Sequence, residues 1–141
     1  MTQDEYKKPL PTPTFASMPF WEAAKAHRLM YQRCRLCGTQ VFYPRDICPG
    51  AQCFGVGTLD WVESSGRGAV YSFTISYQPA HPGFREDVPY VLAIIELEEG
   101  WRMNSNIVDI DLSEIEIGMA VEVCWDDVTA EFTLPKFRPV G

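Results

Sequence analysis

The chain has 141 residues, 46% of them hydrophobic, so it is long enough to bury the core of one compact domain or of two small modules. Its formal net charge of −7 argues against a protein that binds phosphate backbones over its whole surface. The polar start lacks the apolar run of a secretory signal, and no stretch approaches the ~18 consecutive apolar residues of a membrane span, so we expect a cytoplasmic protein without a membrane partner.

The N-terminal part is predicted to be an extended tail followed by one short helix. Residues 1–16 contain three prolines, each of which lacks a backbone donor and disfavours a helix. A helix is expected from about Met18 to Arg28, because Ser17 can cap it and Pro19 fits its first turn.

Four cysteines follow, with short strands predicted around them at 29–33, 40–43 and 59–63. Their pattern is C-x₂-C-x₁₀-C-x₄-C, formed by Cys34, Cys37, Cys48 and Cys53. Closely spaced cysteines in the cytoplasm are more often metal ligands than disulfides, and four thiolates fill a tetrahedral site without an open position for substrate. We therefore predict one structural Zn²⁺ ion. A single iron is the alternative, but the second turn is two residues longer than the C-x-x-C turn of an iron electron carrier.

The second half of the chain is predicted to form about five strands after a glycine-rich turn. They are expected at 69–77, 90–97, 102–108, 121–125 and 132–139, with an irregular loop at 81–89. In the first of these strands, alternation places Val70 on one face and Phe73 on the other. The set fits a small five-stranded barrel of the OB type. The expected fold is therefore mainly β: a tail at 1–16, a helix plus zinc ribbon at 17–63, and the barrel at 64–141.

Charge is unevenly distributed along the chain. Residues 25–45 contain five Lys or Arg and no acidic residue, whereas residues 86–131 contain thirteen Asp or Glu and one Arg. The basic segment is interpreted as an offset to the net charge of four thiolates on a zinc ion. The alternative is that it docks a phosphate-bearing ligand or an acidic partner.

No residue is assigned to catalysis. Cys124 lies on a predicted strand between acidic residues, which raise the pKa of a thiol. His27 and His81 have no Ser or Cys partner visible in the sequence. We expect the chain alone to show no acyl-transfer activity.

Several short motifs occur together between Pro19 and Pro139. They are Pro19-Phe-Trp-Glu, Cys34-Arg-Leu-Cys-Gly, Tyr43-Pro-Arg-Asp-Ile-Cys-Pro, Gly66-Arg-Gly-Ala-Val-Tyr-Ser-Phe-Thr, Pro89-Tyr-Val-Leu-Ala-Ile-Ile-Glu-Leu-Glu-Glu-Gly, Asn106-Ile-Val-Asp and Leu134-Pro-Lys-Phe-Arg-Pro. The chain thereby resembles a thiolase-associated family that pairs a rubredoxin-like zinc ribbon with a C-terminal OB-fold and was long labelled a domain of unknown function. The wide second cysteine turn departs from the Cys-Pro-x-Cys often found in that family.

The resemblance implies an accessory subunit in a hetero-oligomer with a thiolase-like subunit, an acyltransferase that supplies the reactive cysteine. Such a subunit helps to form an acyl-CoA channel, in hydroxymethylglutaryl-CoA synthesis, sterol side-chain removal or aromatic-acid degradation. An acyl-CoA aldolase is the other partner that the family suggests. Binding of nucleic acid is a further alternative, because zinc ribbons and OB-folds also serve that role, but the acidic balance counts against it.

A cleft between the two modules is the expected place for the ligand. The candidate substrate-binding residues are Phe73, Tyr77, Phe84, Tyr90 and Phe137 for the acyl group, and Arg85, Lys136 and Arg138 for the CoA phosphates. The candidate partner-interface residues, expected to be exposed, are Phe20, Trp21 and His81. The alternative is that the aromatic residues form the core and the cations are solvated surface.

Overall fold

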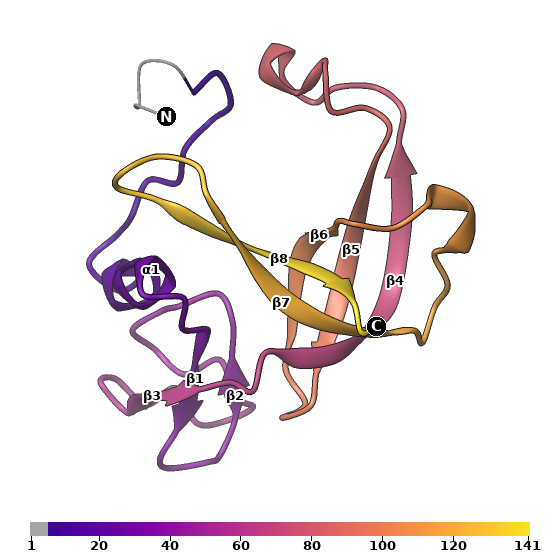
Figure 1. Ribbon diagram of the computed structural model, residues 1–141. Helices are drawn as coiled ribbons and strands as arrows, with labels where there is room; N and C mark the ends of the chain where they lie inside the picture. Colours follow the sequence, from indigo (N-terminus) through magenta and orange to yellow (C-terminus); the bar gives the residue numbers. More distant parts are fainter. Residues whose placement is uncertain (1–5) are drawn as a thin grey trace.

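The computed structural model describes residues 6–141, so the first five residues of the predicted tail lie outside the described part. A three-stranded sheet with one helix packs beside a closed barrel (Figure 1). The elements are α1 (Met18–Lys25), β1 (Met30–Cys34), β2 (Gln40–Val41), β3 (Leu59–Glu63), β4 (Arg67–Ser76), β5 (Tyr90–Leu97), β6 (Arg102–Ile107), β7 (Ala120–Asp127) and β8 (Thr133–Pro139). Short 3₁₀ helices, Pro82–Phe84 and Leu112–Glu114, lie in two of the longer connections.

The sheet topology confirms the predicted fold class. The ribbon has the strand order β2-β1-β3, and the barrel closes in the order β4-β5-β6-β8-β7. The closure between β6 and β8 is parallel and rests on the pairing of Ile107 with Phe137. Phe137 is fully buried inside the barrel with Ile95 and Val121. Its prediction as a ligand contact is therefore wrong, because the barrel wall covers it completely.

Strand β4 contains a β-bulge that shifts the predicted alternation of its side chains. The register with β5 slips between Val70 and Ser72, which leaves Tyr71 as the extra residue. Val70 and Phe73 therefore both pack with the core, whereas Tyr71 is 46% exposed. The prediction that Val70 and Phe73 occupy opposite faces is wrong, because one extra residue reverses the phase of a two-residue repeat.

Helix α1 ends three residues before the predicted Arg28 and lacks the expected cap. The Ser17 hydroxyl accepts a hydrogen bond from the backbone N–H of Thr14 and makes none to the helix. At the other end His27 has a φ of 59°, in the left-handed region, and the N–H of Arg28 donates to the carbonyl of Ala23. This closing turn directs the chain from the helix into β1.

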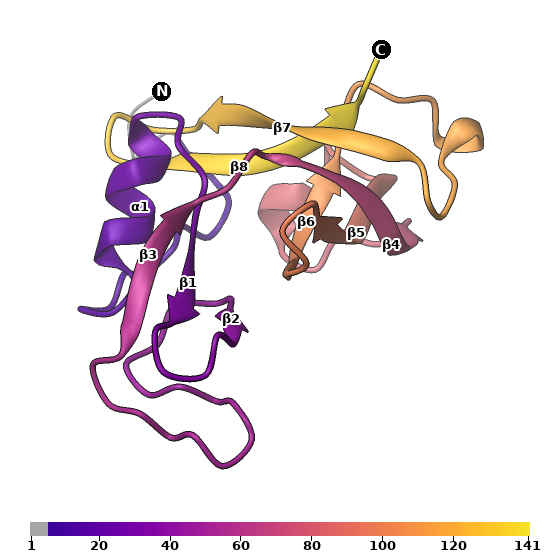
Figure 2. The same ribbon diagram turned by 90° about the horizontal axis from the view of Figure 1, so that it is seen from below.

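A buried aromatic cluster joins the ribbon to the barrel. Trp101, just before β6, is 3% exposed and stacks on Tyr31 of β1 with 5.1 Å between ring centroids. The Trp101 ring also lies 5.1 Å from that of Phe42, which contacts Phe20 of α1 at 5.4 Å. Helix α1 lies beside both β1 and β8 (Figure 2). The prediction that Phe20 is exposed is wrong: it is 1% exposed, because helix, ribbon and barrel enclose it.

The side chain of Glu99, in the turn between β5 and β6, ties the linker between the modules to the barrel. Its carboxylate accepts hydrogen bonds from Ser64 Oγ at 2.6 Å and from the Ser65 N–H at 3.0 Å. It also accepts one from Trp101 Nε1 at 2.9 Å. Partial burial acts to raise the pKa of Glu99, but these hydrogen bonds, with that of Ser64 the strongest, together lower it.

Replacing Glu99 by Gln is expected to lower the free energy of unfolding by about 1 kcal/mol near neutral pH, after allowance for solvent screening of this partly exposed group. The pKa of Glu99 is lower in the folded chain than in the unfolded chain. The carboxylate therefore stabilises the fold above its unfolded pKa, and this contribution is lost as the pH falls through its folded pKa. Urea unfolding at about pH 7 and about pH 3 measures both effects.

The difference in stability between the wild type and Glu99→Gln should close at the lower pH. Glu98→Gln is the matched control, because the Glu98 carboxylate accepts from Ser65 Oγ and pairs with Arg67 on the exposed side of the same turn. An equal loss in the control, or a difference that does not depend on pH, would contradict this role of Glu99.

Candidate metal centre and adjoining groove

The four cysteines meet at the end of the ribbon. Cys34 ends β1 and Cys37 lies in the turn to β2, while Cys48 and Cys53 lie in the connection 42–58 before β3. This connection extends away from the barrel (Figure 2). All four Sγ atoms lie within 4.8 Å of one another. The distance between the sulfurs of Cys34 and Cys53 is 3.8 Å, and that between Cys37 and Cys48 is 3.5 Å.

These spacings fit one tetrahedral metal ion. With Zn–S bonds of about 2.3 Å, the edge of an ideal tetrahedron is about 3.8 Å, close to the two sulfur separations above. A disulfide would bring two sulfurs to about 2.05 Å, so the cysteines are not paired covalently. The four-cysteine cluster can therefore hold one structural zinc ion, and the four thiolates would complete its coordination.

Threonine hydroxyl groups next to the cluster lower the pKa values of two of the four thiols, which favours the thiolate form that binds a metal. Thr58 Oγ1 lies 3.3 Å from Cys34 Sγ, and its hydrogen bond is the main cause that lowers the pKa of Cys34 to about 6. Thr39 Oγ1 lies 3.0 Å from Cys37 Sγ and lowers the pKa of that thiol in the same way. Burial instead raises the pKa of Cys48, so its thiolate depends on a bound cation.

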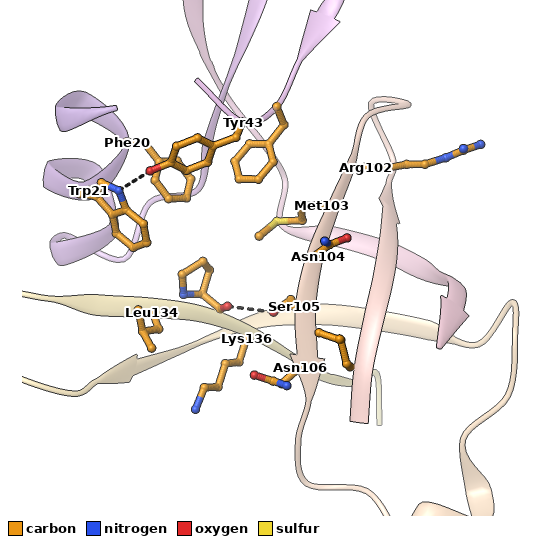
Figure 3. A pocket seen from close by; sticks show the side chains of 13 residues that line it. Phe20, Trp21, Tyr43, Arg102, Met103, Asn104, Ser105, Asn106, Leu134 and Lys136 are labelled. Atoms are coloured by element: carbon orange, nitrogen blue, oxygen red, sulfur yellow. Dashed lines mark hydrogen bonds between the residues drawn. The ribbon is translucent and has the colours of Figure 1, made fainter. Parts of the chain in front are cut away.

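A groove of about 550 Å³ lies between the ribbon and the barrel (Figure 3). The wall on the ribbon side is aromatic, with Phe20 and Trp21 from α1 and Phe42 and Tyr43 from the segment after β2. Trp21 Nε1 donates a hydrogen bond of 2.7 Å to the hydroxyl of Tyr43, so these two side chains form one continuous edge. The predicted cleft between the two modules is thus present, but of the predicted ligand residues only Lys136 is among its described lining residues.

The opposite wall comes from β5, β6 and β8. Met103 points towards the aromatic side chains, whereas Arg102 extends away from them (Figure 3). The Arg102 guanidinium lies 3.7 Å from the ring centroid of Tyr71 on the outside of the barrel. Among the described residues that line the groove there is no carboxylate, imidazole or thiol. The groove is therefore suited to bind an apolar group.

A second cavity of about 500 Å³ adjoins the first, because Asn106, Leu134 and Lys136 line both. Of the predicted ligand residues, Phe84 and Tyr90 line this second cavity, and Lys136 lines both. The remaining aromatic candidates lie elsewhere: Phe73 packs against the barrel core, and Tyr77 is 70% exposed beyond the end of β4.

The cations predicted to contact CoA phosphates are in part already paired. Lys136 Nζ lies 2.6 Å from Asp126 Oδ2, and Arg138 Nε lies 3.2 Å from Glu122 Oε1. Both pairs link β7 to β8, so neither side chain is the free cation that the sequence suggested. Arg85 is exposed on the loop before β5, and within residues 6–141 no carboxylate lies within salt-bridge distance of it.

The N-terminal segment braces the loop 81–88 beside the second cavity. Lys8 forms an ion pair with Asp87 of this loop. Gly83 packs so closely on Lys7 that an added Cβ would stand 2.5 Å from the Lys7 carbonyl oxygen, so a larger residue would force the two segments apart. Residues 6–14 contain no helix or strand, yet part of the segment has a defined contact with the barrel side.

The residues considered for catalysis lie outside both cavities. Burial raises the pKa of the Cys124 thiol, which disfavours the reactive thiolate. His27 Nε2 lies 3.0 Å from Asp127 Oδ1, and its ring stacks on Trp125 with 5.5 Å between centroids. His81 is exposed, and its Nδ1 accepts a hydrogen bond from the backbone two residues later. These contacts support structural roles for the two histidines.

Two family models match consecutive parts of the chain. Residues 21–58 match the ChsH2 rubredoxin-like zinc ribbon domain, and residues 61–126 match the ChsH2 C-terminal OB-fold domain. In the described part of the chain, no helix has the length and apolar character needed to cross a membrane.

Similar proteins include both short and much longer chains. A probable enoyl-CoA hydratase alpha subunit of Thermomonospora curvata is 46% identical over 123 residues, which cover 85% of this chain and 36% of that protein. A DUF35 domain-containing scaffold protein of Methanothermobacter thermautotrophicus is 40% identical over 105 residues, covering 74% of this chain and 77% of that protein. Among solved structures, a chain of an Ltp2–ChsH2(DUF35) aldolase superposes with a TM-score of 0.80 at 42% identity, covering 92% of this chain and 98% of that chain.

Proposed function

The chain belongs to the DUF35 family, with the zinc ribbon and OB-fold of ChsH2, and we propose that it is a non-catalytic scaffold subunit of a hetero-oligomeric complex that processes acyl-CoA. The resemblance noted from the sequence motifs is thereby confirmed for the zinc ribbon, the OB-fold and the DUF35 family. Because the chain spans only 36% of the length of the hydratase alpha subunit that it matches, that whole protein's activity is not transferred to it.

The observation that carries this proposal is the groove between ribbon and barrel. It has one aromatic and one mixed wall, and none of the groups that its described lining residues offer is an activated nucleophile or a general base. A site of this kind can bind and orient an apolar acyl group while another subunit performs the reaction. The reacting groups would come from the partner.

We propose that the partner is a catalytic subunit of the thiolase or aldolase class. The solved relative is described as an Ltp2–ChsH2(DUF35) aldolase, and its DUF35 chain is similar to nearly the whole of this chain, which favours the aldolase class. Lys136, which lines the second cavity, and the exposed Arg85, which follows the cavity residue Phe84 in the chain, would then face the phosphates of the CoA moiety. The proposal places both proteins in the cytoplasm, where the four zinc ligands stay reduced.

Co-purification from the native source tests the proposal directly. An affinity-tagged chain expressed at its native level should recover a subunit whose mass spectrum identifies an acyl-CoA lyase, hydratase or acyltransferase. The isolated chain should turn over no acyl-CoA, because it lacks an activated nucleophile. Recovery of no such subunit, or turnover by the isolated chain, would overturn the proposed function.

Replacing Trp21 by Ala is expected to raise the complex's KM for acyl-CoA by roughly 3- to 10-fold, because one aromatic face of the groove is removed. Steady-state kinetics of the assembled complex measure the effect. Tyr77→Ala is the matched control, since this exposed aromatic residue lines neither cavity. A KM that stays unchanged in Trp21→Ala while the complex remains assembled would place the acyl group elsewhere.

A further inference from the structure

The connections that carry the cysteines also expose an apolar surface. Its members are Leu36, Ile47, Phe54 and Val56, which are 68%, 50%, 68% and 73% exposed. We name these four residues the knuckle patch. Single exposed apolar residues are normal on a protein surface, whereas a contiguous group marks a binding surface.

Contacts between the members show that the patch is contiguous. Ile47 and Val56 form an isolated antiparallel bridge, so their backbones lie side by side. Ile47 and Phe54 line one surface hollow of about 710 Å³ together with Tyr43. Leu36 reaches the same loop from the first cysteine turn, because its Cδ1 would stand 3.2 Å from a Cβ added to Gly55.

The backbone beneath the patch adopts an unfavourable conformation at two residues that carry a side chain. Phe54 has a φ of 49° and Gln52 a φ of 63°, both in the left-handed region that disfavours residues with a Cβ. A bulky residue in this region costs free energy, which packing around its side chain normally offsets. Phe54 is 68% exposed, so it gains little such packing from the residues that the structure describes.

Backbone hydrogen bonds in the loop that carries Cys48 and Cys53 fix the left-handed conformation of Gln52 and Phe54. The Cys48 N–H donates to the carbonyl of Gly55 at 2.9 Å, and the Cys53 N–H donates to that of Gly50 at 3.0 Å. The Gly57 N–H closes the loop by donating to the carbonyl of Asp46. The zinc-ligand loop therefore presents the patch to solvent in a fixed shape, away from the barrel (Figure 2).

The position of the patch indicates what covers it. Tyr43 lines both the hollow of the knuckle patch and the groove between ribbon and barrel. A body seated on the patch would therefore also reach the open edge of the groove formed by Trp21 and Tyr43. The solved relative is described as an Ltp2–ChsH2(DUF35) aldolase, so a second, catalytic subunit is the body that we expect at this edge of the groove.

We propose that the knuckle patch is the docking surface for the catalytic partner subunit, with Phe54 as its central anchor. This inference rests on the proposed function and adds the face by which the two subunits meet. The partner would offer an apolar surface to these four side chains and polar groups to Arg45 and Asp46, which line the same hollow. Preorganisation of the loop by zinc would lower the entropic cost of docking.

The test compares Phe54→Ser with the wild type for binding to the catalytic subunit identified by co-purification and produced separately. Loss of a central aromatic anchor should raise the dissociation constant by at least about 30-fold, as measured by calorimetry. Phe15→Ser is the matched control, because Phe15 is an even more exposed phenylalanine outside the patch. Zinc content and melting temperature should match the wild type in both variants, since neither side chain is buried.

Each other result has a defined meaning. Equal affinity of Phe54→Ser and the wild type overturns the docking surface but leaves the proposed function standing, whereas absence of any acyl-CoA subunit overturns both. If the isolated chain is a dimer that Phe54→Ser converts to a monomer, the patch binds a second copy and the proposal is wrong. Binding to anionic phospholipid vesicles that is lost in Phe54→Ser would equally overturn it.

Discussion

Replacing Cys48 by Ala is expected to release the zinc ion and unfold the ribbon. Cys48 is fully buried, its Sγ lies 3.5 Å from that of Cys37, and the Gly50 N–H donates to it at 3.3 Å. Structural zinc contributes about 10–16 kcal/mol of apparent binding free energy in zinc-finger peptides, which is as large as the whole stability of a typical domain. Three thiolates would leave the ion open to water and weaken its binding.

Metal analysis, circular dichroism and thermal melting measure this effect. The variant should contain less than one zinc per chain and lose more than about 10 °C in Tm. Cys124→Ala is the control, because Cys124 lies on β7, outside the cluster of four sulfurs, and should keep both values. A Cys48→Ala variant that melts like the parent, or iron in the place of zinc, would contradict a structural zinc site.

The parts of this fold that depend only on residues close together in the sequence are predictable from the sequence. Strands β3 and β5 begin and end where expected, because turn residues bound a dense apolar or alternating run. The metal cluster is equally local, since each cysteine pair lies on one short turn. The helix end is less predictable, because a non-glycine residue, His27, adopts the left-handed conformation that stops α1.

The groove is not predictable in this way, because its walls come from segments far apart in the chain. Trp21 on α1 and Tyr43 after β2 are 22 residues apart. The facing Met103 and Leu134 lie on β6 and β8. Nothing in the local pattern of these residues separates a groove wall from a core position. The pairing of Lys136 with Asp126 likewise depends on the β7–β8 register, which the sequence alone leaves open.

Replacing Trp101 by Ala is expected to separate the ribbon from the barrel and thereby abolish the groove. The indole fills the junction between the modules, where it stacks on Tyr31, contacts Phe42 and donates to the Glu99 carboxylate. Truncation of a buried aromatic residue costs about 3–5 kcal/mol, a large part of the stability of a small domain. Phe42 would lose its support, and it forms part of the aromatic wall of the groove.

Urea unfolding and limited proteolysis of the linker 64–66 distinguish this separation from a general loss of stability. Trp101→Ala should lower the urea midpoint of unfolding. It should also make the linker cleavable under conditions in which the strands of the barrel still resist the protease, because the contacts across the junction are lost before those within the barrel. Trp125→Ala is the matched control. This half-buried indole lies on β7 and stacks on His27, away from Tyr31 and Phe42. It should lose less stability and leave the linker protected. An equal loss of stability in the two variants would contradict this role of Trp101. The contact of α1 with β8 would then be the one that holds the two modules together.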